Sequence, residues 1–253
     1  MRIRTMLTVA AIGSLTLTGL AASPSSADGE PGDPAEIVTG VLTPEEESAV
    51  QTAPGSTEKV DMFYEGRKID PASDWQGANV CVEVSEDGTM QCFDNDSESN
   101  KFLAAHAPTA QARAGARQAL AGVEQVRPAV AEQAVSAPSA TAKTAAVKGY
   151  SSCPGSYVCL WQDANYAGRR LQWPTYSESK TRHLDQYSPS FQDKASSAFV
   201  NRPQRGVEVY DFRTGLPDPH LFLGAGYSLY PSFKKIDYTY GGSWNDRADA
   251  IKF

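Results

Sequence analysis

"FQDKASSAFV", residues 191–200, returns 53 residues later as "WNDRADAIKF", residues 244–253. Similarity at a fixed spacing is typical of a duplicated supersecondary unit. In this alignment Asp193 of the first copy corresponds to Asp246 of the second. The repeat therefore indicates a C-terminal region built from two related halves. It also raises a question, since the phrase could be a binding site or only part of the scaffold.

The sequence around the repeat is rich in aromatic residues and turns from Tyr150 onward. It contains short β-type runs such as "YVCLW", "RRLQW", "SAFVN" and "VEVYDF", separated by Gly, Pro, Asn, Asp and Ser. Short strands of this kind indicate an antiparallel sandwich or barrel, and about 100 residues are enough for one two-sheet core. We therefore expect an all-β domain over residues 150–253.

An aromatic and glycine pattern also recurs in the two halves. The first half has Trp161, Tyr166 and Gly168 in "WQDANYAG", and the second offers Tyr210, Phe222 and Gly224. Both glycines fall where a hairpin would fold back on itself, a place that favours positive φ. We expect the two second aromatics, Tyr166 and Phe222, to cover these turns.

These residues resemble the βγ-crystallin Greek keys, in which an aromatic residue followed by aromatic-x-Gly forms a folded hairpin and a later Asp-x-x-Ser-Ser strand closes the unit. More narrowly, "CPGSYVCLWQDANYAGRRLQW" is similar to the secreted actinobacterial proteins of peptidase inhibitor family I36, the Streptomyces metalloproteinase inhibitor-like proteins. The resemblance covers residues 150–253. It implies a two Greek-key βγ-crystallin-like sandwich and a secreted inhibitor of an extracellular peptidase, for which a thermolysin-like metalloprotease is one candidate. The alternatives are a calcium-binding structural or stress-related protein, or a secreted antimicrobial or toxin-like domain.

The repeated phrase is also a candidate calcium site, because the corresponding stretch of the crystallins can supply calcium ligands. The first copy offers oxygen donors in Asp193, Ser196 and Ser197, which suit a hard cation. The second copy lacks both hydroxyls, and a basic residue follows the aspartate in each copy. In the alternative, structural interpretation, the serines hydrogen-bond the folded hairpin and the aspartates cap a turn. Calcium is the one cofactor that the sequence suggests.

The second folded hairpin is longer than the first, which gives a candidate inhibitory loop. Its extension contains "TGLPDPH", residues 214–220, and the two prolines favour a preorganised loop. We expect Leu216, Pro217 and Asp218 to form this loop, with Leu216 displayed to a hydrophobic pocket of the peptidase. An ordinary surface insertion is the alternative, and the connection at 174–190 around Leu184 is a rival contact region.

Catalysis is not expected. His106, His183 and His220 are far apart in the sequence, and none belongs to a metalloprotease motif. The chain has no Gly-x-Ser-x-Gly motif and no glycine loop that would cradle a phosphate.

The part of the chain before residue 150, which we expect to be a largely disordered or helical pro-region or linker, is divided by its composition. We expect a signal peptide at 1–27, an acidic disordered segment at 28–77, a small β-hairpin segment at 78–102 and an Ala-rich linker at 103–149.

Residues 28–101 hold 18 acidic and 4 basic side chains, whereas residues 150–253 hold 10 acidic and 12 basic ones. No basic cluster indicates nucleic acid, and no later apolar stretch indicates a membrane span. The expected location is extracellular and the expected partner is a peptidase.

The four cysteines indicate two disulfides, because an exported protein reaches an oxidising environment. We expect Cys81 to pair with Cys92 and Cys153 with Cys159, since each pair lies in its own short segment. Cys81 and Cys92 would face each other across the predicted hairpin, whose turn uses Gly88. The other two connectivities stay open at the level of sequence.

Overall fold

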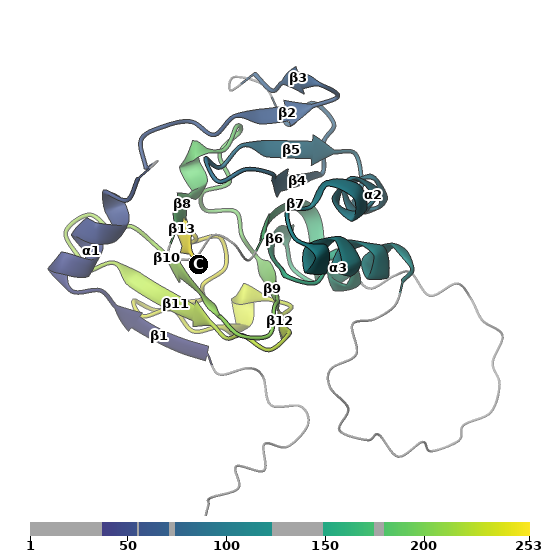
Figure 1. Ribbon diagram of the computed structural model, residues 1–253. Coiled ribbons are helices and arrows are strands. Elements are labelled where there is room, and N and C mark those ends of the chain that lie inside the picture. Colours follow the sequence, from purple (N-terminus) through teal and green to yellow (C-terminus); the bar gives the residue numbers. More distant parts are fainter. Residues whose placement is uncertain (1–36, 55, 71–73, 123–148, 175–179) are drawn as a thin grey trace, which may run out of the picture. The chain divides into compact units, whose positions relative to one another are not determined.

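The computed structural model describes residues 37–54, 56–70, 74–122, 149–174 and 180–253, shown in Figure 1. The expected signal peptide and residues 123–148 of the expected linker lie outside this range. All the described residues belong to one unit, Gly32–Phe253. None of their helices is long and apolar enough to cross a membrane.

Two sheets form most of the structure, in agreement with the expected β class. The five-stranded sheet has the order β1(Ile37–Val41), β11(Pro219–Leu223), β10(Val207–Tyr210), β13(Ala250–Lys252) and β8(Thr181–His183). The eight-stranded sheet has the order β12(Ser228–Tyr230), β9(Ser197–Asn201), β6(Tyr157–Asp163), β7(Ala167–Pro174), β4(Val80–Glu83), β5(Met90–Phe93), β2(Met62–Tyr64) and β3(Arg67–Lys68). The helices are α1(Pro44–Gln51), α2(Asp96–His106) and α3(Ala110–Leu120), with 3-10 turns η1(Gly149–Ser152), η2(Leu184–Gln186) and η3(Phe233–Lys235).

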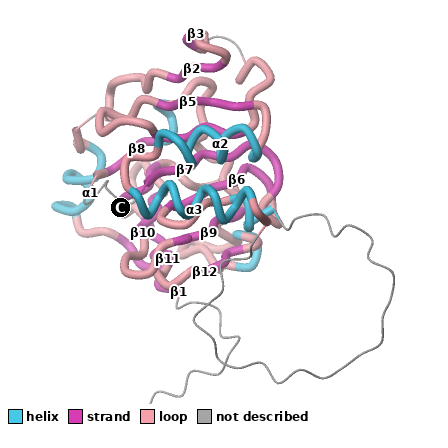
Figure 2. Tube along the Cα trace, turned by 45° about the vertical axis from the view of Figure 1, so that its right-hand side comes forward, coloured by secondary structure: helices cyan, strands magenta, loops and turns pink. Residues whose placement is uncertain are grey.

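Strand β6 is buried on both of its faces, which explains the continuous apolar run "YVCLW". Val158 and Leu160 belong to the main core, which also includes side chains from the five-stranded sheet. Tyr157, Cys159 and Trp161 point to the other face and pack in a second core with residues of α2 and α3. Figure 2 shows these two helices side by side over the strands of the larger sheet.

The two halves of the C-terminal region exchange one strand with each other. The first half contributes β6, β7 and β9 to the larger sheet and β8 to the smaller one. The second half contributes β10, β11 and β13 to the smaller sheet and β12 to the larger one. Each half therefore supplies three strands to one sheet and a fourth strand to the other.

The expectation of disorder over residues 28–77 is wrong for the part that the structure describes. Strand β1 pairs with β11 over five residues, and β2 pairs with β5. After β1, Leu42 and Val50 are buried against Tyr210 and Ala250. Pairing with the sheet and these few apolar contacts order a segment whose own composition is mainly polar.

The hairpin is present as expected, but it is not a separate module. Cys81 lies opposite Cys92 in the antiparallel pair β4 and β5, and Gly88 in the turn has a φ of 98°. Strand β4 also pairs in parallel with β7, with Cys81 opposite Leu171. The hairpin therefore extends the sheet of the C-terminal region.

The Ala-rich segment is also no simple linker over residues 103–122. In α3, Ala112 and Ala116 are buried against the second core. A Cβ atom on Gly115 would lie 2.6 Å from the carbonyl oxygen of Gly155, so the helix backbone approaches that turn closely. The helix has few large apolar side chains, and its small ones allow it to pack closely against the second core instead. A stable fragment that starts between residues 140 and 152 is accordingly not expected, since it would lose β4 and both helices.

One of the two glycines predicted to have positive φ does so. Gly168 has a φ of 73° at the turn between β6 and β7. The prediction for Gly224 is wrong, because the glycines with positive φ in the second half are Gly215, Gly226, Gly241 and Gly242. The amide of Gly224 instead donates to the hydroxyl of Tyr230 at 2.6 Å.

Both expected disulfides are present, Cys81 with Cys92 and Cys153 with Cys159. The second one closes the segment that leads into β6. The alternative connectivities are thereby excluded.

Candidate functional site

The repeated phrase lies where the two halves meet. The amide of Asp193 donates to the carbonyl of Ala248 at 3.0 Å, and the amide of Asp246 donates to the carbonyl of Ala195 at 3.1 Å. These two bonds are equivalent under the 53-residue offset. Both alanines are fully buried. The backbone of the phrase therefore joins one half to the other.

The two serines of the first copy have separate structural roles. Ser197 donates its hydroxyl to the carbonyl of Asp163 at 2.7 Å and accepts the amide of Tyr166 at 3.1 Å, so it holds the turn between β6 and β7. Ser196 donates to a carboxylate oxygen of Asp246 at 3.0 Å. Ser197 thus makes the hairpin contact that the structural interpretation of the phrase predicts.

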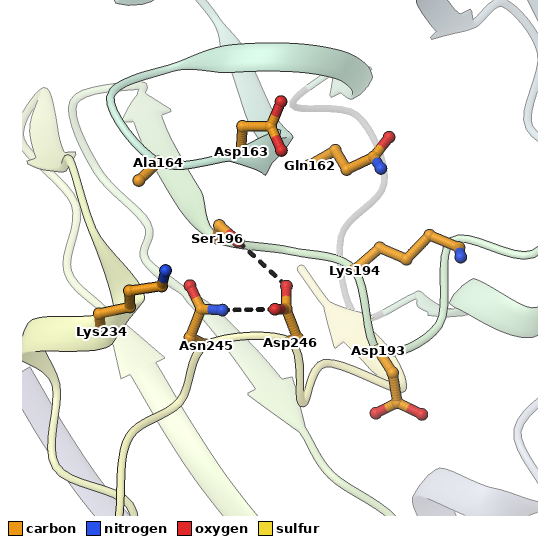
Figure 3. A pocket seen from close by; sticks show the side chains of 9 residues that line it. All are labelled: Gln162, Asp163, Ala164, Asp193, Lys194, Ser196, Lys234, Asn245 and Asp246. Atoms are coloured by element: carbon orange, nitrogen blue, oxygen red, sulfur yellow. Dashed lines mark hydrogen bonds between the residues drawn. The ribbon is translucent and has the colours of Figure 1, made fainter.

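Two of the three expected calcium ligands, Asp193 and Ser196, line one pocket, and Ser197 is not among its lining residues. A pocket of about 470 Å³ is lined by Gln162, Asp163, Ala164, Asp193, Lys194, Ser196, Lys234, Asn245 and Asp246. Figure 3 shows the Asp193 carboxylate turned away from Ser196 and Asp246, with Lys234 beside the hydrogen-bonded group. Within the described ranges, no group of three His, Cys, Asp or Glu side chains is placed to hold a metal ion.

Asp249 of the second copy takes the place of Ser196 and supports the start of the longer loop. Its amide donates to the carbonyl of Tyr210 at 2.7 Å, just as the amide of Ser196 donates to Trp161 at 2.9 Å. Its carboxylate accepts the amide of Phe212. Burial raises the pKa of Asp249 to about 7, and the negative charge of Asp193 contributes to the same shift.

The extended loop connects β10 to β11 and is closed across its base. The amide of Arg213 donates to a carboxylate oxygen of Asp218 at 2.6 Å, and the amide of Asp211 donates to the carbonyl of Pro219 at 3.1 Å. Between these bonds, Leu216 is 48% exposed, whereas Asp218 is fully buried. Leu216 is available to a partner, and the buried Asp218 closes the base of the loop through its bond to Arg213.

The loop is also anchored by two segments distant in sequence. Tyr240, itself exposed, donates its hydroxyl to the carbonyl of Pro217 at 2.7 Å. From helix α1, Gln51 donates to the Asp218 carboxylate at 2.6 Å, and Glu47 accepts the amide of Asp218 at 2.6 Å. No motif in the sequence marks these three anchoring residues, so they could not be predicted from it.

The rival contact region does not display its leucine. Leu184 is fully buried in the main core. Residues 175–179 of that connection lie outside the described ranges. The loop with Leu216 is therefore the stronger candidate for a contact with a partner.

Comparison with known proteins gives one match. No curated protein and no solved structure matches the chain. The model of peptidase inhibitor family I36 matches residues 146–215, which include β6 to β10 and end one residue before Leu216. Over this segment, which is less than half of the chain, the sequence is similar to peptidase inhibitor family I36.

Proposed function

We propose that the protein inhibits an extracellular peptidase and contacts it through the loop between β10 and β11. The family match supports an inhibitory role. The observation that carries the loop assignment is the exposure of Leu216 on a loop whose base is bonded through Asp218. A loop already held in one conformation loses little entropy on binding.

The proposed target is a peptidase with a hydrophobic specificity pocket, as in thermolysin-like enzymes. Leu216 is the apolar side chain that such a pocket would receive, and the neighbouring Tyr240 would lie at the edge of the contact. An anchor in a pocket surrounded by weaker contacts is how binding energy is usually distributed at an interface.

The proposed fold is the two Greek-key βγ-crystallin type. The exchange of one strand between the halves supports this assignment, as do the equivalent hydrogen bonds of the two phrases. Secretion is part of the proposal as well. The two disulfides support it because they persist in oxidising compartments.

The proposal is tested by titrating the full chain against a thermolysin-like and a subtilisin-like peptidase, with residual peptide hydrolysis as the readout. We expect inhibition of the thermolysin-like enzyme.

Calcium titration by calorimetry should accompany the assay. We expect no micromolar binding, because Lys194 and Lys234 line the pocket that contains Ser196 and Asp246. Micromolar calcium binding with no inhibition of either enzyme would favour the calcium-binding alternative.

A further inference from the structure

The segment 37–53, which we call the strap, consists of β1, α1 and the residues that join and follow them. Helix α1 has a defined start, since the Thr43 hydroxyl accepts the amide of Glu46 at 3.3 Å and the Glu46 carboxylate accepts the amide of Thr43 at 2.9 Å. This capping box fixes which side chains face the protein. Glu47 and Gln51 are four residues apart and so lie on one face of the helix.

The strap is docked on the five-stranded sheet. Strand β1 pairs with β11, and Figure 1 shows β1 at the edge of this sheet with α1 next to it. Val50 is buried near Tyr210, and its carbonyl lies 2.9 Å from Nε2 of His183. A helix of this length has little stability in isolation. Its conformation therefore depends on this docking.

Asp218 is the point at which the strap meets the candidate inhibitory loop. Its carbonyl accepts the amide of Leu42 at 2.8 Å. Its amide donates to Glu47, and its carboxylate accepts from Gln51 and from the amide of Arg213. Only the bond to Arg213 lies within the loop, whereas the other three come from the strap. A buried carboxylate requires such partners, because its desolvation is costly without them.

We infer that the strap positions the Leu216 loop, with Glu47 and Gln51 as positioning residues that act through Asp218. Residues 37–53 then contribute to inhibition, and they are not a pro-region that can be removed without effect. The consequence for inhibition rests on the proposed function. The positioning itself does not, because it can be measured in the absence of any peptidase.

The test compares a Glu47→Ala and Gln51→Ala double variant with the parent. Hydrogen exchange at the amides of Asp211 and Arg213, which close the base of the loop, reports the loop, and the inhibition constant reports function. We expect exchange at these amides and the inhibition constant each to rise at least about 10-fold. Glu45→Ala is the matched control, because it removes the same charge from an exposed site on the same helix, and it should behave like the parent.

The outcomes separate the two proposals when Leu216→Gly is measured alongside. Unchanged exchange in the double variant would overturn the positioning role. Faster exchange with parental inhibition, while Leu216→Gly inhibits weakly, would also overturn it but leave the proposed function standing. Parental inhibition by Leu216→Gly would instead overturn the loop assignment, and the exchange data alone would then decide the role of the strap. If the double variant does not fold, Gln51→Ala alone removes one side-chain bond and is judged by the same criteria.

Discussion

Asp193 and Asp246 adopt the same left-handed backbone conformation, with φ values of 54° and 56°, and each donates its amide to an alanine in the other half. Aspartate is one of the few residues with a side chain that visits this region readily. The two alanines, Ala195 and Ala248, are fully buried where the halves meet. The repeated phrase thus serves mainly as the junction of the two halves.

Enlarging a buried alanine at this junction should destabilise the whole domain. We expect Ala195→Leu to lower the free energy of unfolding by about 1–3 kcal/mol, because the added carbons have no free space. The free energy is measured by urea denaturation. Ala121→Leu, at an exposed position, is the control. Equal stability of the two variants would show that the junction is not tightly packed.

The ion pair between Glu83 of β4 and Arg182 of β8 connects the N-terminal hairpin to the smaller sheet. Its nitrogen and oxygen atoms are 2.6 Å apart, and the Glu83 side chain is fully buried. Glu83→Ala should cost about 3–5 kcal/mol of unfolding free energy, because the Arg182 charge stays buried without its carboxylate.

The exposed pair of Arg67 and Glu65 supplies a control for the previous prediction. Glu65→Ala should cost at most about 1 kcal/mol, since water screens this pair. Both values come from denaturant unfolding monitored by tryptophan fluorescence. If Glu83→Ala cost no more than Glu65→Ala, the hairpin would not be an integral part of the sheet.

Asp249 should make stability depend on pH. Burial raises its pKa from 3.8 to about 7 in the folded chain, so between these values the folded state holds a proton that the unfolded state has released. The free energy of unfolding should therefore fall as the pH rises from about 4 to about 7. Asp249→Asn removes the charge and keeps an oxygen that can accept the amide of Phe212.

We accordingly expect Asp249→Asn to flatten this fall and to be more stable than the parent at pH 8. Thermal unfolding at pH 4, 6 and 8 measures the effect. A parental pH profile in the variant would mean that other groups, such as Asp193, whose pKa is also raised by burial, carry the dependence.

The sequence predicted the features that depend on short-range patterns. The run "YVCLW" predicted a strand, and the hairpin turn at Gly88 placed Cys81 opposite Cys92. Residue spacing also identified the long loop with Leu216. In each case the determining residues lie close together in the chain, so their pattern can be read from one segment.

The features that the sequence did not predict depend on contacts between distant segments. Strand β1 is mostly exposed, so its composition gives little sign of a strand, and its pairing with the distant strand β11 orders it. The helix α3 has few large apolar side chains and packs through Ala112 and Ala116. The bond between Gln51 and Asp218 spans 167 residues and leaves no local signal.

The central claim is tested most directly by the inhibition constants of the parent and of Leu216→Gly for a thermolysin-like peptidase. The account predicts that the parent inhibits and that the variant inhibits at least about 10-fold more weakly, a difference of about 1.4 kcal/mol or more. The thermal midpoint should stay nearly unchanged, because Leu216 is exposed and makes no part of the core. Equal inhibition by the two proteins, or no inhibition by the parent, would contradict the account.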